Sequence, residues 1–280
     1  MDVSIIVNHY RLSSVLELSL TYLLKWQKEY EMRNGEGSTE IIVVDSGTTR
    51  KTREMVSTGF PSIVFLSHEH NIGFGKSVNA GLKRAQGSFI FILNADCIVP
   101  YPKEIDVLLD YLKQQRHVGL VGPQLLNFDN THQHSAFRFY TPLTILARRT
   151  PFGRTTKGVR AIERFIMARS ARRSNEGTNV DWLMGSALLT KKKYVEKVGL
   201  FDEQFFMYME DVDWCRRFWE AGLRVMYCPA SKIYHFHGKA SRNKNPLAFL
   251  FNKYTRIHLM SAYKYFKKYG TKAPSYTMKY

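Results

Sequence analysis

The sequence has little cysteine. Only Cys97, Cys215 and Cys228 occur among 280 residues, and no two of them stand in C-x-x-C spacing. An odd number of cysteines without that spacing indicates neither a disulfide framework nor a zinc knuckle. We therefore expect a protein of a reducing compartment, with the cytoplasm as its location.

Long hydrophobic runs are also missing. No apolar stretch approaches the roughly 18 residues that cross a bilayer. The opening residues, MDVSI, lead into a strand pattern without the basic stretch that begins a signal peptide. We expect neither export nor a membrane span, and a chain that is 44% hydrophobic can bury one large core or two small ones.

Two common phosphate-binding fingerprints are absent. Gly75-Lys76-Ser77 looks like the end of a P-loop, but the first glycine of that motif would have to stand where His70 does. A dinucleotide fingerprint would need its third glycine at Val78. The segment NIGFGKSVNAG at 71–81 therefore needs an explanation other than binding of ATP or a dinucleotide.

Acidic residues are scarce in two segments. Residues 132–180 hold ten Lys and Arg against two Glu, and residues 232–280 hold eleven Lys and Arg with no Asp or Glu. These segments account for the net charge of +17, and the remainder is nearly neutral. Such segments attract anionic surfaces, for example phosphate-bearing lipid or nucleic acid, although a solvated surface rich in lysine is the alternative.

Four short runs of β-branched and aromatic residues predict buried strands. They are VSIIVN at 3–8, EIIVVD at 40–45, SIVFL at 62–66 and SFIFILN at 88–94. Nearly continuous apolar character is typical of parallel strands covered on both faces. Helical stripes alternate with them, namely Val15, Leu18, Tyr22, Leu23 and Trp26, then Val78, Leu82 and Ala85. This alternation predicts an α/β fold with a doubly wound, mostly parallel sheet flanked by helices.

The pattern weakens in the second half. Residues 137–173 are basic and aromatic with only a weak helical period, which predicts a mobile, exposed insert. Regularity returns with a helix face of Val212, Cys215, Phe218, Trp219 and Gly222. The strand RVMYC follows and should stop at Pro229. Because no repeat or low-complexity linker intervenes, we expect both halves to share one sheet.

Polar residues directly follow three of the predicted strands. They are Asn8-His9-Tyr10, Asp45-Ser46 and Asn94-Ala95-Asp96. Ligands of an open parallel sheet collect at the carboxyl ends of its strands, so these residues should meet in one crevice. Asp45 is then placed to accept hydrogen bonds from a ribose or base, and Asp96 to hold a divalent cation. Each residue taken alone could instead be a turn or helix cap.

Two further clusters carry titratable groups. Glu210-Asp211-x-Asp213 opens a helix, where the dipole favours carboxylates, and a functional interpretation makes one of these acids a general base. His235-Phe236-His237 would place two imidazoles on one face of an extended chain, a weak indication of a metal contact.

In their order along the chain, these motifs resemble the family 2 inverting glycosyltransferases with a GT-A fold. The likeness runs through VSIIVNHYR, EIIVVDSG, NIGFGKSVNAG, FILNAD and FDEQFFMYMEDVDWCRR and covers about the first 240 residues. NIGFGKSVNAG is similar to the family segment N-x-G-F-x-x-x-x-N-x-G, which lies beside the nucleotide-sugar. Within the family, SAFRFYTPLTILARRTPFG and DWLMGSALL look most like rhamnosyltransferases that use dTDP-L-rhamnose.

The resemblance implies a role for each matching residue. Asp211 matches the catalytic base, which deprotonates an acceptor hydroxyl during inversion. Asp96 matches the metal-binding acid of a D-x-D element, with Mg²⁺ or Mn²⁺ as cofactor, and His235 matches a histidine near the metal or diphosphate. Asn94 replaces the first Asp of that element, which makes metal dependence less certain. The residues expected to bind the nucleotide-sugar or acceptor are Asn8, Tyr10, Asp45, Asn71, Gly73, Lys76, Asn79, Asn94, Trp182, Gly185 and Glu210.

The same resemblance implies a domain plan and partners. Residues 1–240 would form the GT-A domain, with a nucleotide-sugar-binding half at 1–125 and an acceptor-binding half at 126–240. The acceptor would be a glycan or a polyprenyl-diphosphate-linked glycan of cell-surface polysaccharide synthesis. Residues 241–280 would form a basic amphipathic extension, which either contacts an anionic membrane at the inner face of the plasma membrane or packs on the domain.

Two other classes of function stay open. A non-catalytic nucleotide-sugar or polysaccharide-binding protein on the same fold would keep Asp45 and lose Asp96 or Asp211, yet both acids are present. Nucleic-acid binding is not expected, because no nucleic-acid motif accompanies the positive charge. The sequence gives no indication of oligomeric state.

Overall fold

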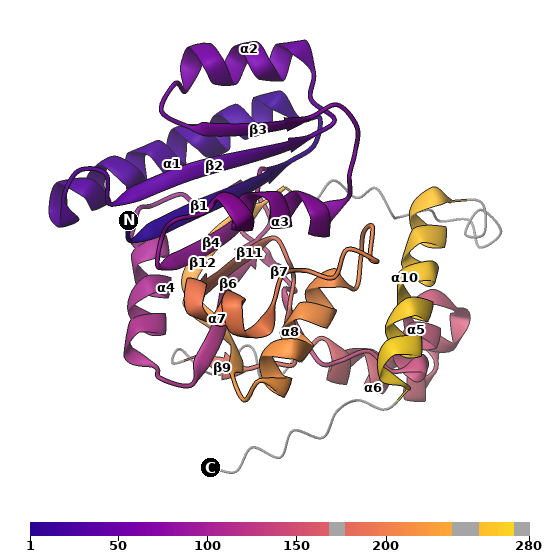
Figure 1. Ribbon diagram of the computed structural model, residues 1–280. Coiled ribbons are helices and arrows are strands. Elements are labelled where there is room, and N and C mark those ends of the chain that lie inside the picture. Colours follow the sequence, from indigo (N-terminus) through magenta and orange to yellow (C-terminus); the bar gives the residue numbers. More distant parts are fainter. Residues whose placement is uncertain (168–176, 237–251, 272–280) are drawn as a thin grey trace.

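Four parallel strands begin the sheet, where the sequence predicts them. In the computed structural model they are β1 (Val3–His9), β2 (Thr39–Ser46), β3 (Val64–His68) and β4 (Phe89–Asn94), and they pair in the order β3-β2-β1-β4 (Figure 1). The structure describes residues 1–167, 177–236 and 252–271, apart from the side chain of Arg149. The predicted α/β class is confirmed.

The second half of the chain extends the same sheet. β11 (Ala187–Lys191) runs antiparallel between β4 and β6 (Val118–Leu126). β6 then pairs in parallel with β12 (Arg224–His235), and β5 (Cys97–Ile98) lies antiparallel at the end of β12. Two short strands, β7 (His132–Gln133) and β9 (Thr178–Asn179), pair with β6 and β12. The expectation that both halves share one sheet is confirmed.

Helices cover both faces of this sheet. Val3, Ile5 and Val7 of β1 pack into one core, and Ile6 packs into the other, because alternate side chains of a strand point to opposite faces. The first core also contains side chains from α1 (Ser13–Asn34), α2 (Arg50–Gly59) and α4 (Lys103–Gln114). The second contains side chains from α3 (Phe74–Arg84), α7 (Lys192–Val198) and α8 (Glu210–Glu220).

The predicted stripe of α1 is confirmed at Leu23 and Trp26, which are buried, whereas Val15 and Tyr22 are half-buried and Leu18 is exposed. The buried positions are Leu16, Ser19, Leu20, Leu23, Trp26 and Tyr30. The N-terminal part of α1 has apolar residues on two sides, so its period alone does not select the core side. Ser19 helps to select it, since its Oγ donates a hydrogen bond to Cys97 O at 2.9 Å. The shorter stripe of Val78, Leu82 and Ala85 is buried as predicted.

The predicted mobile insert is folded over its described part. Residues 136–167 and 177–183 form β8 (Ala136–Phe137), α5 (Pro142–Arg149), the 3₁₀ helix η1 (Pro151–Arg154), α6 (Thr156–Phe165), β9 and β10 (Trp182–Leu183). Phe137, Tyr140 and Phe165 are buried around Trp182, with the Phe137 and Trp182 rings stacked at 4.4 Å. These aromatics come from several short elements, so they show no single period. Residues 168–173 of the predicted insert lie outside the described residues.

Pro229 does not end its strand. β12 continues to His235, and its pairing with β6 is irregular between Cys228 and Lys232. A proline without an N–H fits at such an irregularity, where one ladder bond is already lost. The continuation matters for function because it delivers His235 to the carboxyl end of β4.

The C-terminal helix α10 (Lys253–Tyr269) packs on the domain. Its inner face buries Thr255, His258, Ser261, Ala262 and Tyr265. Figure 1 shows α10 with α5 and α6 at one corner of the molecule, away from α1 and α2. Of the two alternatives for the extension, the inner face of α10 therefore shows packing on the domain. Residues 241–251 and 272–280 of the extension lie outside the described residues.

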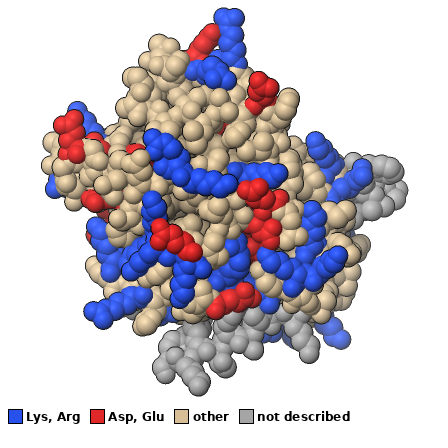
Figure 2. All heavy atoms as spheres, viewed as in Figure 1, with Lys and Arg blue, Asp and Glu red and all other residues tan. Residues whose placement is uncertain are grey.

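Positive charge extends over the lower half of the molecule as it is viewed in Figure 2, and it is not confined to this corner. Figure 2 shows many Lys and Arg over the half of the view that holds α7, α8 and α10. Within α10, Lys253, Arg256, Lys264, Lys267 and Lys268 occur without any acidic residue. Among the described helices, none combines the length and the apolar character needed to cross a bilayer.

Candidate active site

A pocket of about 280 Å³ opens at the carboxyl ends of β1, β2 and β4. This is the edge where an open sheet of this kind binds its ligands. Eight of the residues predicted for the site line it, namely Asn8, Tyr10, Asn71, Gly73, Asn94, Gly185, Glu210 and Asp211. The structure therefore brings together residues that lie as much as 203 positions apart in the sequence.

Asp211 lies in the first turn of α8, and two backbone N–H groups donate hydrogen bonds to its carboxylate. Its Oδ2 accepts from Gly185 N at 3.0 Å and its Oδ1 from Val212 N at 2.9 Å. Burial raises the pKa of Asp211 to about 6, although both N–H groups act in the opposite direction. A carboxylate with this pKa, oriented into a pocket, is suited to accept a proton near neutral pH.

The two neighbouring acids differ from Asp211. Glu210 is 5% exposed, and its Oε2 has no hydrogen-bond partner among the described residues. Burial, followed by the charge of Asp211, raises the pKa of Glu210 well above its usual range. Asp213 is fully buried and accepts from Arg217, Lys268 and Tyr269. Of the three acids, only Asp211 is both directed into the pocket and suited to be charged at neutral pH.

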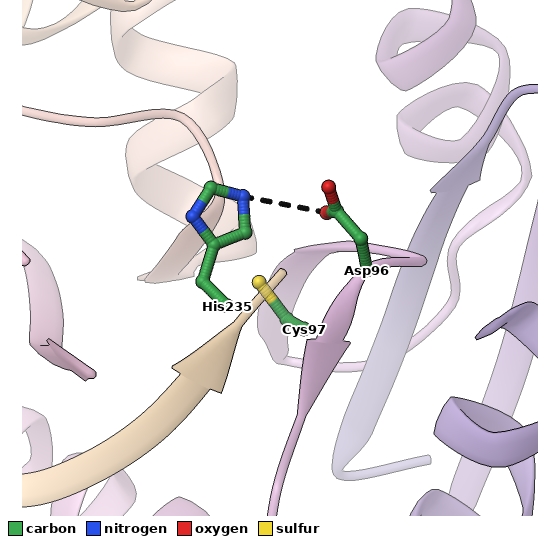
Figure 3. Close-up of side chains that lie close together, drawn as sticks. All are labelled: Asp96, Cys97 and His235. Carbon is green, nitrogen blue, oxygen red and sulfur yellow. Dashed lines mark ion pairs between the residues drawn. The ribbon is translucent and has the colours of Figure 1, made fainter. Parts of the chain in front are cut away.

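A second cluster lies beside the pocket. The possible ligand atoms of Asp96, Cys97 and His235 are all within 4.8 Å of one another (Figure 3). His235 Nδ1 lies 2.6 Å from Gln133 Oε1, an atom that can only accept, so Nδ1 carries the proton. The lone pair of Nε2 then faces Asp96 Oδ1 at 3.4 Å. Ser186 Oγ also lies 3.3 Å from Nε2, and with the proton on Nδ1 both Nε2 and Asp96 Oδ1 are acceptors that could bind a cation between them.

Asp96 and His235 fit a divalent metal ion, whereas Cys97 does not. Asp96 Oδ1 is buried without a hydrogen-bond partner among the described residues, and a cation would satisfy it. The Cys97 Sγ donates to Ser186 O at 3.3 Å, and burial raises the pKa of this thiol well above its usual range. A protonated thiol is no ligand for Mg²⁺ or Mn²⁺, which prefer oxygen. Asn94 lines the pocket nearby and adds no charge.

Asp45 occupies a more enclosed position than expected. It is buried outside the pocket lining, and its Oδ1 accepts from His9 Nδ1 at 2.8 Å. His9 itself lines the pocket. From the sequence, His9 is one of the polar residues at the end of the first predicted strand and has no predicted role. In the structure, His9 is the residue that connects Asp45 to the pocket.

Besides Asp45, Asp96 and His235, three further predicted residues lie outside the pocket lining. Asn79 is buried, and its side chain bonds the backbone of Phe201 twice and Glu203 once, which fastens α3 to the segment before α8. Trp182 is buried among aromatic rings and donates to Arg138 O. Lys76 is exposed on α3.

Most of one pocket wall consists of residues that the sequence did not indicate as part of the site. Phe206, Met207 and Tyr208 line the pocket immediately before Glu210. Tyr208 and Met209 have φ of 71° and 69°, a left-handed conformation that is rare outside glycine. The aromatic run FFMYM was the only available signal, and it has no period that would distinguish a wall from a core.

Gly73 joins this wall to the opposite side of the pocket. Phe74 N donates to Phe206 O at 3.1 Å, and a Cβ on Gly73 would lie 2.4 Å from that oxygen. Gly73 also has φ of +85°, which side chains rarely adopt. We expect Gly73→Ala to lower the free energy of unfolding by about 2 kcal/mol or more, measured by urea denaturation.

Gly37→Ala is the matched control for Gly73→Ala. Gly37 has a similar φ of +72°, but a Cβ added there would have nothing within 4 Å, so the substitution adds backbone strain alone. We expect a loss of about 1 kcal/mol there. Equal losses at both positions would show that the close approach of Gly73 to Phe206 has no importance.

Comparisons with known proteins show what the chain is similar to. The profile described as Glycosyl transferase family 2 matches residues 4–199. N-acetylglucosaminyl-diphospho-decaprenol L-rhamnosyltransferase of Mycobacterium tuberculosis is 28% identical over 228 residues, which cover 77% of this chain and 72% of that protein. Rhamnosyltransferase WbbL of Escherichia coli is 38% identical over 88 residues, 31% of each chain.

Solved structures show the same fold. The mannosyltransferase PcManGT from Pyrobaculum calidifontis, in complex with GDP-Man and Mn²⁺, superposes with a TM-score of 0.58 at 19% identity, over 97% of this chain and 65% of that one. GalNAc-T7 with UDP, GalNAc and Mn²⁺ gives a TM-score of 0.62 at 16% identity, over 88% of this chain and 46% of that one. The chain thus spans less than half of GalNAc-T7, and both similarities concern the fold.

Proposed function

The chain belongs to glycosyl transferase family 2 and has the GT-A fold, and from this premise we propose that it transfers L-rhamnose from dTDP-rhamnose to a lipid-linked glycan, with inversion. The observation that carries the proposal is Asp211, oriented by two N–H groups in the pocket beside the Asp96–His235 pair. The names of the M. tuberculosis and E. coli relatives support rhamnose, and the former supports a polyprenyl-diphosphate-linked acceptor.

In the proposed reaction Asp211 acts as general base. Its carboxylate takes the proton from the acceptor hydroxyl as that oxygen attacks the anomeric carbon from the face opposite the diphosphate. The N–H groups of Gly185 and Val212 hold the carboxylate in one orientation, so little is lost in aligning it. Asp96 and His235 would hold Mg²⁺ or Mn²⁺, and the bound ion would supply positive charge to stabilise the departing diphosphate.

The remaining pocket residues would bind the donor and acceptor. Asn8 and Asn94 are linked by a 3.4 Å hydrogen bond at the ends of β1 and β4, where the sugar diphosphate would lie. His9, held by Asp45, would reach the nucleoside. The wall at 206–208 would face the acceptor. We retain the division into a donor half at 1–125 and an acceptor half at 126–240 as part of this proposal.

Release of nucleoside diphosphate from a panel of nucleotide-sugars tests the function. The panel should include dTDP-rhamnose, a UDP-sugar and GDP-mannose, each with Mg²⁺, Mn²⁺ or EDTA and a polyprenyl-diphosphate-linked acceptor. We expect release of nucleoside diphosphate from dTDP-rhamnose and from no other donor of the panel, and we expect this release to require Mg²⁺ or Mn²⁺. Donor binding without release in the presence of acceptor would favour a non-catalytic nucleotide-sugar-binding protein, and release from another donor would correct the sugar.

The pKa of Asp211 gives a pH prediction. A general base must be deprotonated, so kcat/KM should fall about tenfold per pH unit below about 6 and level off above it. Donor affinity, measured over the same pH range by calorimetry, serves as the control and should change little. A rate that rises as the pH falls through 6 would exclude Asp211 as the base.

We also propose that the outer face of α10 contacts an anionic membrane. Lys253, Arg256, Met260 and Tyr263 are exposed along one side of the helix, which combines positive charge with apolar side chains. Sedimentation with vesicles tests this proposal, with binding expected for phosphatidylglycerol vesicles at low salt and little for phosphatidylcholine. Lys253→Glu with Arg256→Glu should weaken binding. No sedimentation of the unaltered chain at low salt would overturn the proposal.

A further inference from the structure

Helix α10 lies beyond the residues that the family profile matches, yet it packs against the candidate active site. The profile ends at residue 199, and α10 begins at Lys253. Its inner face contacts the segment 202–213, which contains both the pocket wall and Asp211. The contacts fall into two groups, one at the wall and one at the first turn of α8.

At the pocket wall, α10 holds the backbone of residues 204–208. Ser261 Oγ donates to Met207 O at 2.9 Å, and Lys264 Nζ donates to Gln204 O at 2.7 Å. The His258 ring lies edge-on to the Tyr208 ring, with 5.1 Å between centroids. Tyr208 lines the pocket in a left-handed conformation, which persists only where the surroundings hold it.

At the first turn of α8, α10 bonds to a fully buried acid. Asp213 Oδ1 accepts from Lys268 Nζ and from Tyr269 OH, both at 2.7 Å, while Oδ2 accepts from Arg217 Nε at 2.9 Å. Lys268 Nζ also lies 2.6 Å from Asp202 Oδ2. Asp213 is two residues from Asp211 in the same helical turn, so a shift of one moves the other.

These bonds all end on the segment 202–213, and five of its residues line the side of the pocket that would face the acceptor, namely Phe206, Met207, Tyr208, Glu210 and Asp211. Asn8 and Asn94 lie on strands of the sheet. Loosening α10 should therefore disturb the acceptor side and Asp211 before it disturbs binding of the donor.

We propose that α10 holds the pocket wall and the catalytic acid of the active site in position. Lys268 and Tyr269 would be positioning residues, which act on Asp211 through Asp213. Ser261 and His258 would likewise be positioning residues, which hold the pocket wall at 206–208. The inference rests on the proposed function for its kinetic consequences, but its structural content is independent of which sugar is transferred.

The kinetic test uses the full chain with Lys268→Met and Tyr269→Phe combined. Because displacement of a reacting group by about 1 Å can cost about 100-fold, we expect kcat for transfer to fall about 10- to 100-fold. The Kd for dTDP, used as the donor-site probe, should stay within about twofold. The single variant Lys268→Arg keeps the positive charge, so its kcat should be much closer to that of the unaltered chain than the kcat of the double variant is. Lys267→Met, which removes the same charge from the neighbouring exposed position, should leave both quantities unchanged.

Amide hydrogen exchange supplies a test that does not need turnover. In the double variant, exchange should quicken in residues 202–213 and stay unchanged in β1 and β4. If the double variant does not fold, Ser261→Ala gives the same comparison for the wall with a smaller change. Unchanged exchange at 202–213 would overturn the proposal, whether or not the unaltered chain transfers a sugar.

A general loss of stability would also overturn it. In that case dTDP affinity and transfer would fall together, and exchange would quicken across the sheet as well as in residues 202–213. Failure of the proposed function looks different, because the unaltered chain would then transfer no sugar from any donor while the local exchange pattern remained measurable.

Discussion

Asp211→Asn should lower the rate of sugar transfer by about 10²- to 10⁴-fold, the usual contribution of a general base. Asparagine has nearly the same shape, and its carbonyl oxygen can keep one of the two bonds from Gly185 N and Val212 N, while its NH₂ group would face the other N–H. It cannot take a proton from the acceptor hydroxyl. Release of nucleoside diphosphate with acceptor present measures the rate, and calorimetry with dTDP measures donor affinity, which should change by less than about threefold.

An exposed acid provides the control for Asp211→Asn. Asp110 lies on the outside of α4, and Asp110→Asn removes the same charge at a distance from the pocket. It should leave rate and affinity unaltered. A near-normal rate for Asp211→Asn would move the role of base to another group, and a loss of dTDP affinity equal to the loss of rate would make Asp211 a donor-binding residue.

Asp96→Ala should abolish the response of the enzyme to metal. We expect a fall in rate of about 100-fold or more, since a bound cation supplies several kcal/mol to a departing diphosphate. EDTA should reduce the unaltered chain to the same level and should have no further effect on Asp96→Ala. Rates with Mn²⁺ should exceed those with Mg²⁺, because one of the proposed ligands is the imidazole of His235 and Asn94 adds no second carboxylate.

Cys97→Ala distinguishes a metal ligand from a neighbour. The thiol lies in the same cluster but is protonated and donates to Ser186 O, so its removal should leave the metal response intact. A lost metal response in Cys97→Ala would indicate a softer ion than Mg²⁺ or Mn²⁺. Full activity of the unaltered chain in EDTA would contradict the metal proposal itself.

The first half of the fold could be predicted because its signals are local. Continuous β-branched runs fix β1 to β4, and alternation with helices fixes the class. The stripe of α1 could be placed only in part, since apolar side chains stand on two of its sides and the buried Ser19, which bonds to Cys97 O, gives no apolar signal. Pro229 was misleading for a similar reason, because pairing with β6 carries the strand past it.

The candidate site divides in the same way. Residues at strand ends, such as Asn8 and Asn94, could be placed from topology alone, because parallel strands end at one edge. The wall at 206–208 could not be placed, since it contacts Ser261 and His258, about 50 positions later in the sequence. The burial of Asp45 behind His9 likewise depends on side-chain packing that no spacing reveals.

The backbone strain at Tyr208 and Met209 has a consequence for engineering the stability of this protein. Two successive residues with positive φ raise the energy of the folded state by roughly 1–2 kcal/mol each, so glycine at either position would relieve strain. A selection for variants that stay folded at higher temperature should therefore recover glycine at position 208 or 209. The same substitutions would free the wall that α10 holds, so the variants that survive heating best should be among the slower catalysts.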